Sequence, residues 1–89
     1  MQIQAEQPHN IILEKRRELR ISGVKDIDSF TETRIILNTV MGELVIKGQD
    51  LHVINLDNDT GNLHMNGSIS SMVYNNYKTT DNVIKKLFR

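Results

Sequence analysis

The sequence predicts a small all-β protein, because one strand pattern occurs three times along it. Residues 19–23, 44–48 and 63–67 each have apolar side chains at the first and third positions and a glycine at the fifth. Apolar residues at every second position point to one face of a strand. The glycine marks a place where a side chain would be in the way or where a positive φ is required. The core must come from Ile, Leu and Val, which suits strands.

The composition limits the chain to one domain with a modest core, since it has 89 residues. Its 11 basic and 11 acidic residues cancel, so the molecule as a whole does not attract nucleic acid or anionic membrane. It has no cysteine, which excludes disulfides and favours a reducing compartment. Residues 1–10 lack the apolar run of a signal peptide, and no stretch reaches the ~18–20 apolar residues of a membrane span. We expect a soluble intracellular protein that self-associates or has a partner.

The N-terminal part is expected to be a flexible tail over residues 1–12. Asn10 can cap a short helix over residues 11–17, and the charged run 14–18 is then its solvated face, or else a lead-in to the first strand. The first strand is expected over residues 18–22. A short irregular strand follows over residues 24–30 and ends in a turn.

The middle of the chain predicts a hairpin in which residues 34–40 and 43–47 flank a turn at Met41-Gly42. A two-residue turn there pairs Thr39 with Leu44. This register places four apolar side chains on one face, which are Ile35, Leu37, Leu44 and Ile46.

A second hairpin is predicted in which strands over residues 51–57 and 62–66 flank the turn residues 58–61, which tolerate unusual backbone angles. The turn pairs Asp57 with Asn62, and the same register then places further residues opposite each other: Leu56 and Leu63, Ile54 and Met65, His52 and Gly67, and Asn55 and His64. The first strand of this hairpin is either apolar on both faces or bulged near residues 53–54.

A last strand is expected over residues 68–75, after the second hairpin. Ile69 and Val73 are predicted on one of its faces. Met72 and Tyr74 are predicted on the other.

The C-terminal segment, residues 78–89, changes to a helical period. We expect a short amphipathic helix whose apolar residues form a candidate interaction surface, consisting of Val83, Ile84, Leu87 and Phe88. Basic residues near its end suit the helix dipole. The helix would cover the sheet of the same chain, or dock on another subunit or partner, because so short a helix is marginal alone. Membrane-surface contact is a lesser alternative, because the helix buries little apolar area.

The usual catalytic and ligand-binding patterns are not found in the sequence. The predicted register puts His52 and His64 on opposite faces, so they do not converge on a metal. Residues 57–61 resemble a calcium loop only faintly, because the later glutamate is missing. The sequence has no phosphate-binding motif and no nucleophile elbow. We therefore expect no enzyme, no cofactor and no metal; the remaining residues of note are structural glycines, namely Gly23, Gly42, Gly48, Gly61 and Gly67.

The order and spacing of the motifs between residues 19 and 74 resemble the YabP/YqfC family of sporulation proteins, and YabP more closely than YqfC. The motifs that carry the resemblance are Leu-x-Ile-x-Gly-Val at 19–24, Asp-Ser-Phe-x-Glu at 28–32, Thr-x-x-Gly-x-Leu-x-Ile-x-Gly at 39–48, Leu-x-Val at 51–53, Gly-x-Leu-x-Met-x-Gly at 61–67 and Ile-x-x-x-Val-Tyr at 69–74. The resemblance implies a protein of the mother cell that takes part in building the spore envelope. It implies no catalytic residues.

These observations together predict an antiparallel β-meander of six or seven strands, curled into a sandwich or barrel, over residues 13–77. A short β-solenoid is the alternative architecture. We expect a non-catalytic protein that self-assembles or binds proteins of the spore envelope in the mother cell, at or near the forespore surface, through its least covered strand edge and its terminal helix. We expect a homo-oligomer, no nucleic acid and at most peripheral membrane contact. The alternative function is a β-barrel that binds a small molecule or a lipid head group.

Overall fold

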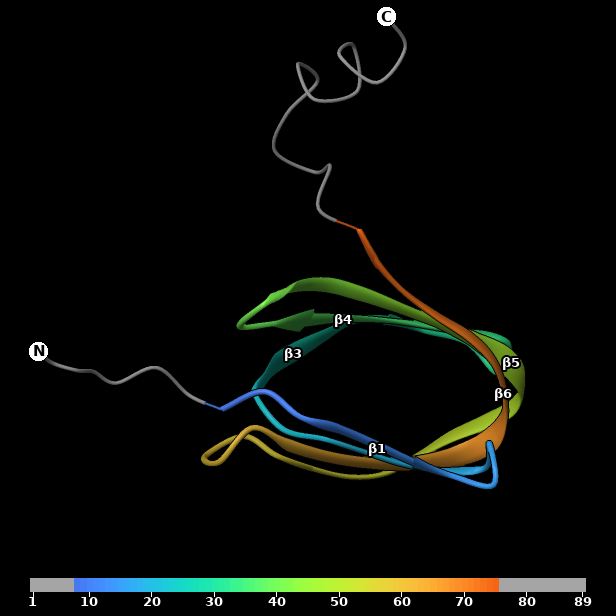
Figure 1. Ribbon diagram of the computed structural model, residues 1–89. Helices are drawn as coiled ribbons and strands as arrows, with labels where there is room; N and C mark the ends of the chain where they lie inside the picture. The colour runs from blue at the N-terminus through green and yellow to red at the C-terminus, as the bar shows by residue number, and fades with distance from the viewer. Residues whose placement is uncertain (1–7, 76–89) are drawn as a thin grey trace, which may run out of the picture.

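A computed structural model describes residues 8–75 of the chain, and there it is built from strands alone (Figure 1). The strands are β1 (Ile11–Glu14), β2 (Glu18–Ile21), β3 (Val24–Phe30), β4 (Arg34–Thr39), β5 (Gly42–Asp57) and β6 (Asn62–Asn75). They form one antiparallel sheet in the order β1-β2-β6-β5-β4-β3. The all-β prediction is confirmed, and the antiparallel pairing rules out the solenoid. No helix that could cross a membrane occurs within residues 8–75.

The short link between β2 and β3 forces this sheet to curl. Only Ser22 and Gly23 join the two strands, yet β6, β5 and β4 lie between them in the sheet. Four strand spacings in a flat sheet would cover about 19 Å, whereas the step from residue 21 to residue 24 reaches roughly 11 Å. The sheet therefore folds over into two layers (Figure 1). Its edge strands β1 and β3 do not pair, so the sheet is curled but not closed. Of the two predicted forms, a sandwich or a barrel, the closed barrel is therefore wrong.

β5 and β6 continue through both layers, whereas the sequence predicted a break in each at a glycine. The strands bend together at the right of Figure 1, and their register shifts near Gly48 and again before His52. A Cβ atom at Gly48 would lie 2.0 Å from the carbonyl oxygen of Ser68. Gly67 has a φ of +140°, and a Cβ there would lie 2.7 Å from the carbonyl oxygen of Asp50. The two glycines allow the bent strands to approach this closely.

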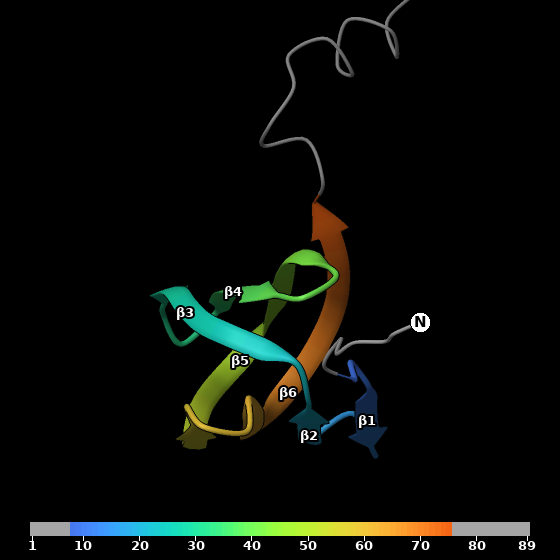
Figure 2. The ribbon, with the colours of Figure 1, turned by 90° about the vertical axis from the view of Figure 1, so that its left-hand side faces the viewer.

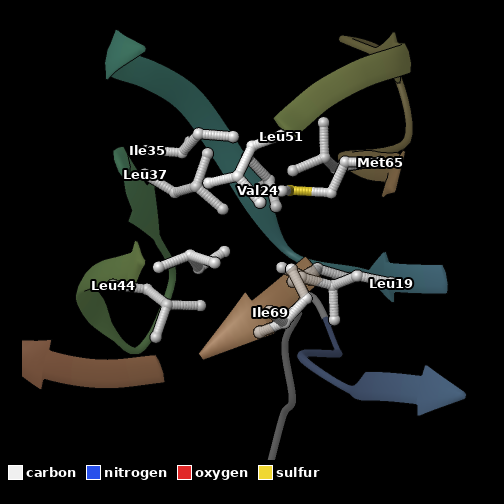
Figure 3. Close-up of a cluster of buried hydrophobic side chains, with 11 residues drawn as sticks. Leu19, Val24, Ile35, Leu37, Leu44, Leu51, Met65 and Ile69 are labelled. Carbon is white, nitrogen blue, oxygen red and sulfur yellow. The ribbon is translucent and has the colours of Figure 1, made fainter. Parts of the chain in front are cut away.

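The space between the layers is filled by apolar side chains from every strand except β1 (Figure 3). The buried residues are Leu19, Ile21, Val24, Ile35, Leu37, Leu44, Ile46, Leu51, Leu63, Met65 and Ile69. They include all four residues that the first hairpin was expected to place on one face, so that part of the prediction is confirmed.

The register of the first hairpin differs from the prediction by two residues. Thr39 pairs with Gly42 rather than with Leu44, so the turn consists of Val40 and Met41. The Thr39 hydroxyl holds this turn, because it accepts a bond from the N–H of Met41 (3.0 Å) and donates to the carbonyl of Gly42 (2.7 Å). A slip of two residues keeps every side chain on its predicted face.

The second hairpin has the predicted pairs Asp57–Asn62, Leu56–Leu63 and Asn55–His64. The proposed bulge is also present, between Val53 and Asn55. Because of the bulge, Val53 lies opposite Met65, and the prediction that Ile54 does so is wrong. Ile54 is 51% exposed.

The last part of β6 corrects a further prediction. Ile69 and Val73 were expected on one face, but Ile69 is 3% exposed and Val73 is 56% exposed. The register shifts between the pairs Lys47–Ser71 and Gly48–Ile69, which leaves one extra residue in β6. Met72 lies opposite the buried Ile46, so it shares the inner face with Ile69.

The helix expected over residues 11–17 is wrong, because the chain forms β1 there. β1 pairs with β2 through a tight turn in which Lys15 and Arg16 have φ angles of 55° and 56°. The pairing of β1 with β2 packs Ile11 and Leu13 against the core. This packing outweighs the tendency of Asn10 to cap a helix. β1 begins inside the segment expected to be a tail. The C-terminal helix and its residues Val83, Ile84, Leu87 and Phe88 lie outside the described residues.

Candidate interaction surface

An apolar stripe crosses three neighbouring strands on the outer face of the sheet. Ile36 of β4 pairs with Val45 of β5, which pairs with Val73 of β6. Residues opposite each other in antiparallel strands share a face. Because the neighbours Ile35, Leu37, Leu44 and Ile46 point into the core, the stripe points outward. Ile36 and Val45 are half-buried, and Val73 at the end of the stripe is exposed.

Rows of opposite charge lie on the two sides of this apolar stripe. The first row runs from Arg34 through Lys47 to Ser71 and is cationic. The second runs from Asn38 through Glu43 to Asn75, and Asp26 of β3 adjoins it.

Side-chain bonds order the acidic row. The amide of Asn38 donates to Asp26 (2.8 Å), and the amide of Asn75 donates to Glu43 (3.0 Å).

The stripe ends at a strand edge, which we call the β6 edge (residues 71–74). The first half of β6 lies between β2 and β5, and the N–H groups of Gly67 and Ile69 donate to the carbonyls of Arg17 (3.1 Å) and Arg16 (2.9 Å). Within the described chain, residues 71–74 pair with β5 only. Figure 2 shows β6 rising past β1 and β2 to its end. Alternate backbone groups of such an edge point outward, ready to pair with another strand.

The other strand edges of residues 8–75 are protected in ways that the β6 edge is not. β3 has Lys25, Asp26 and Asp28 and two register shifts. β1 has only four residues. The second half of β5 is bulged. The β6 edge reads Ser-Met-Val-Tyr, without charge or proline. Charges, bulges and shortness are how proteins discourage strand pairing, so the β6 edge is the one best suited to a partner.

A hollow of about 380 Å³ lies beside the β6 edge and is lined by Val45, Lys47, Ser71, Val73, Tyr74 and Asn75. The Tyr74 hydroxyl contacts Nε2 of His9, whose Nδ1 donates to the carbonyl of Ser22 at 2.7 Å. The two rings meet edge to face at 5.8 Å. Partial burial raises the pKa of Tyr74 above its ordinary value of 10.0. These contacts join the N-terminal segment to the end of β6.

The outer face of the other layer contains a bond between a histidine and a carboxylate. Nε2 of His64 donates to Glu18 at 2.9 Å, and this bond holds the pKa of Glu18 below its ordinary value of 4.5. A hollow of about 390 Å³ lies beside the pair, lined by Asn10, Ile12, Arg20, Ile21, Ser22, Asn55, Asn62, Leu63 and His64.

The two strand histidines lie on one face, which corrects the prediction of opposite faces. His52 pairs with Asn66, not with Gly67, and therefore points outward like His64. Nδ1 of His52 donates to the carbonyl of Asp50 at 2.9 Å. Residues 8–75 contain no group of three or more His, Asp or Glu side chains that could hold a metal ion.

The five glycines singled out in the sequence hold structural positions. Gly23, Gly42 and Gly61 lie at links and turns with positive φ, whereas Gly48 and Gly67 lie within β5 and β6 at the bend. The apolar stripe was not found from the sequence. It depends on the register of three strands, and only the uncharged run at residues 71–74 was visible as a signal.

The fold and its surface define a class of small all-β proteins, each a single curled antiparallel sheet with open edges. The family model described as the YabP family matches residues 5–81. The curated protein named Spore protein YabP, from Bacillus subtilis (strain 168), is 39% identical over 66 residues, which cover 74% of this chain. The match spans 66% of the length of that relative. The chain belongs to the YabP family of sporulation proteins, as its motifs predicted.

Proposed function

We propose that this chain is a non-catalytic protein that acts in spore envelope assembly by binding protein through the β6 edge and the apolar stripe. The observation that carries the proposal is the uncharged edge at residues 71–74, placed where the stripe of Ile36, Val45 and Val73 ends. The family and the name of its Bacillus subtilis relative support a role in sporulation. The mother cell, at the forespore envelope, is the proposed place of action.

The physical basis is strand addition. A strand that pairs with the β6 edge gains main-chain hydrogen bonds, and its side chains can extend the outer rows of the sheet. It would also cover Val73, which is now 56% exposed. Hydrogen bonds supply affinity in this mode, while the apolar row between two charged rows supplies register.

The alternative, a barrel that holds a small molecule or lipid head group between its layers, has less support. The space between the layers is occupied by eleven buried apolar side chains (Figure 3). A ligand there would have to displace a packed core, which costs several kcal/mol. A metabolite that raises the melting temperature of the purified protein would favour this alternative.

Spore formation tests the proposal directly. In the spore-forming host, Val73→Lys should lower the yield of heat-resistant spores, because a lysine at the end of the stripe opposes strand pairing. Ile12→Lys is the matched control, since Ile12 is 53% exposed on the outer face of β1, away from the stripe. Both purified variants should keep the wild-type circular dichroism spectrum, which shows that they are folded. Normal spores from a folded Val73→Lys protein would refute the proposal.

A further inference from the structure

We infer that the β6 edge pairs with the β6 edge of a second copy of this chain, antiparallel and with a two-fold axis at Val73. The inference rests on the proposed interaction function and names its partner. It follows from the order of the rows on the outer face. A two-fold rotation about Val73 places the apolar stripe next to itself and the cationic row next to the acidic row.

The apolar stripe gives the register. In antiparallel pairing centred on Val73, this residue lies opposite Val73 of the second copy. The stripe of Ile36, Val45 and Val73 then continues into the same three residues of the partner copy, so one apolar row crosses six strands. Centring the pairing on Ser71 or Met72 would place Val73 beside polar or inward-facing residues. Parallel pairing would turn the outer face of one copy to the inner side of the other.

The charged rows agree with the same axis. Rotation about Val73 places the row of Arg34, Lys47 and Ser71 in line with the row of Asn75, Glu43 and Asn38 of the second copy. Each cationic row thus continues as an acidic row, and no row of like charge meets itself.

Apolar burial and backbone hydrogen bonds, rather than charge, should supply the affinity. Lys47 and Glu43 of the second copy would be about 14 Å apart, which is three strand spacings. That separation exceeds the Debye length of ~8 Å at physiological salt, so their attraction is largely screened. We therefore expect a dimer that persists at high salt. The pairing is short, so we expect dimerisation to depend on protein concentration.

The first test of the inference is the mass of the protein in solution. Light scattering on the full chain, over a range of concentrations, should show a shift from 10.2 kDa toward twice that mass. Val73→Lys should raise the dissociation constant about tenfold or more. A full chain that stays monomeric would overturn the inference. It would mean that another protein or residues 76–89 cover the edge, and the spore assay would still decide the proposed function.

Single-cysteine cross-linking tests the register, and the chain has no cysteine of its own. Two Cα atoms facing each other at the axis lie about 4.5–5.5 Å apart, within the range that a disulfide spans. Val73→Cys should therefore form a disulfide-linked dimer under mild oxidation. Ser71→Cys is the matched control on the same strand and face. Its two copies would be about 14 Å apart, four residues along the strands, and should not cross-link.

The cross-linking outcomes separate the inference from the function on which it rests. A dimer in which Ser71→Cys cross-links as readily as Val73→Cys would overturn the axis at Val73. A dimer in which neither cross-links would place the contact elsewhere and overturn the inference. In both cases the chain would still associate, so the interaction function would stand. Ile12→Cys gives the background from random collisions of an exposed thiol.

Discussion

Replacing Gly48 by alanine should destabilise the protein strongly, because the β5–β6 crossing leaves no room for a methyl group. The added Cβ would lie 2.0 Å from the carbonyl oxygen of Ser68, and it would also lie 3.1 Å from a methyl carbon of Leu51. The close atom is backbone, so no side-chain rotation relieves the contact. β5 and β6 would have to separate by about 1 Å to reach 3.0 Å, the shortest separation that such atoms tolerate.

The loss in the free energy of unfolding can be estimated from the interactions that a separation of β5 and β6 by about 1 Å would break. Hydrogen bonds near 2.9 Å would lengthen beyond the ~3.2 Å limit, and a buried group left without a partner costs about 1–3 kcal/mol. Overpacking adds about 1–3 kcal/mol, while the stiffer unfolded chain of an alanine variant returns about 0.4–1 kcal/mol. We expect a net loss of about 3 kcal/mol. For a domain of this size that corresponds to a melting temperature lower by roughly 12 °C or more.

Urea unfolding followed by circular dichroism measures this loss. Ser68→Ala is the control, because the exposed Ser68 side chain lies at the same crossing and its removal adds no atoms. We expect this control to remain within about 0.5 kcal/mol of the wild type. If Gly48→Ala unfolds at the same urea concentration as the control, the close approach of the two strands is not required and the reasoning is refuted.

Three further predictions concern the core, the bond between His64 and Glu18, and the contact between His9 and Tyr74. In urea unfolding, Leu51→Ala should lower the free energy of unfolding by about 2–5 kcal/mol, whereas Ile54→Ala should lower it by less than about 0.5 kcal/mol. The reason is that the bulge leaves Leu51 buried and Ile54 exposed. Equal losses for the two variants would contradict the bulge. The lowered pKa of Glu18 means that its stabilising contribution is present above pH 4.5 and is lost as pH falls through that lowered pKa. In the Glu18→Gln variant, the urea midpoint should therefore fall less steeply as the pH is lowered. An unchanged pH dependence would show that the bond from His64 to Glu18 does not cause it. Tyr74→Phe should lower stability by about 1 kcal/mol by removing the hydroxyl that contacts the N-terminal histidine, and no loss would show that this contact is not stabilising.

The local turn residues decided how much of the fold could be predicted from the sequence. The second hairpin was placed in register because Asp57 and the residues up to Gly61 form a turn by themselves: Asp57 Oδ1 accepts from the N–H of Asp59 at 2.9 Å. The first hairpin was misplaced by two residues, because a glycine at position 42 suggested a turn that the Thr39 hydroxyl places one residue earlier.

Bulges account for the predictions that failed along the two long strands. One extra residue reverses every later side chain, so Val73 points outward and His52 shares a face with His64. The bulge near residues 53–54 was one of two alternatives that the apolar pattern left open, whereas no residue type indicated the extra residue in β6 between Ile69 and Ser71. The interaction surface could not be predicted for the same reason. Its members are far apart in sequence and become a stripe only through the observed register.

The sharing of β5 and β6 by both layers has a consequence for how this protein folds. Because both layers share these strands, we expect unfolding to be one cooperative event with little sub-global opening. β2 can pair with β6 only late in synthesis, because Glu18 pairs with Asn66, which follows it by 48 residues. During synthesis the β1–β2 hairpin emerges first and must wait for β6, while β3 to β6 can pair neighbour by neighbour. The hairpin that is synthesised first is thus the last to join the sheet.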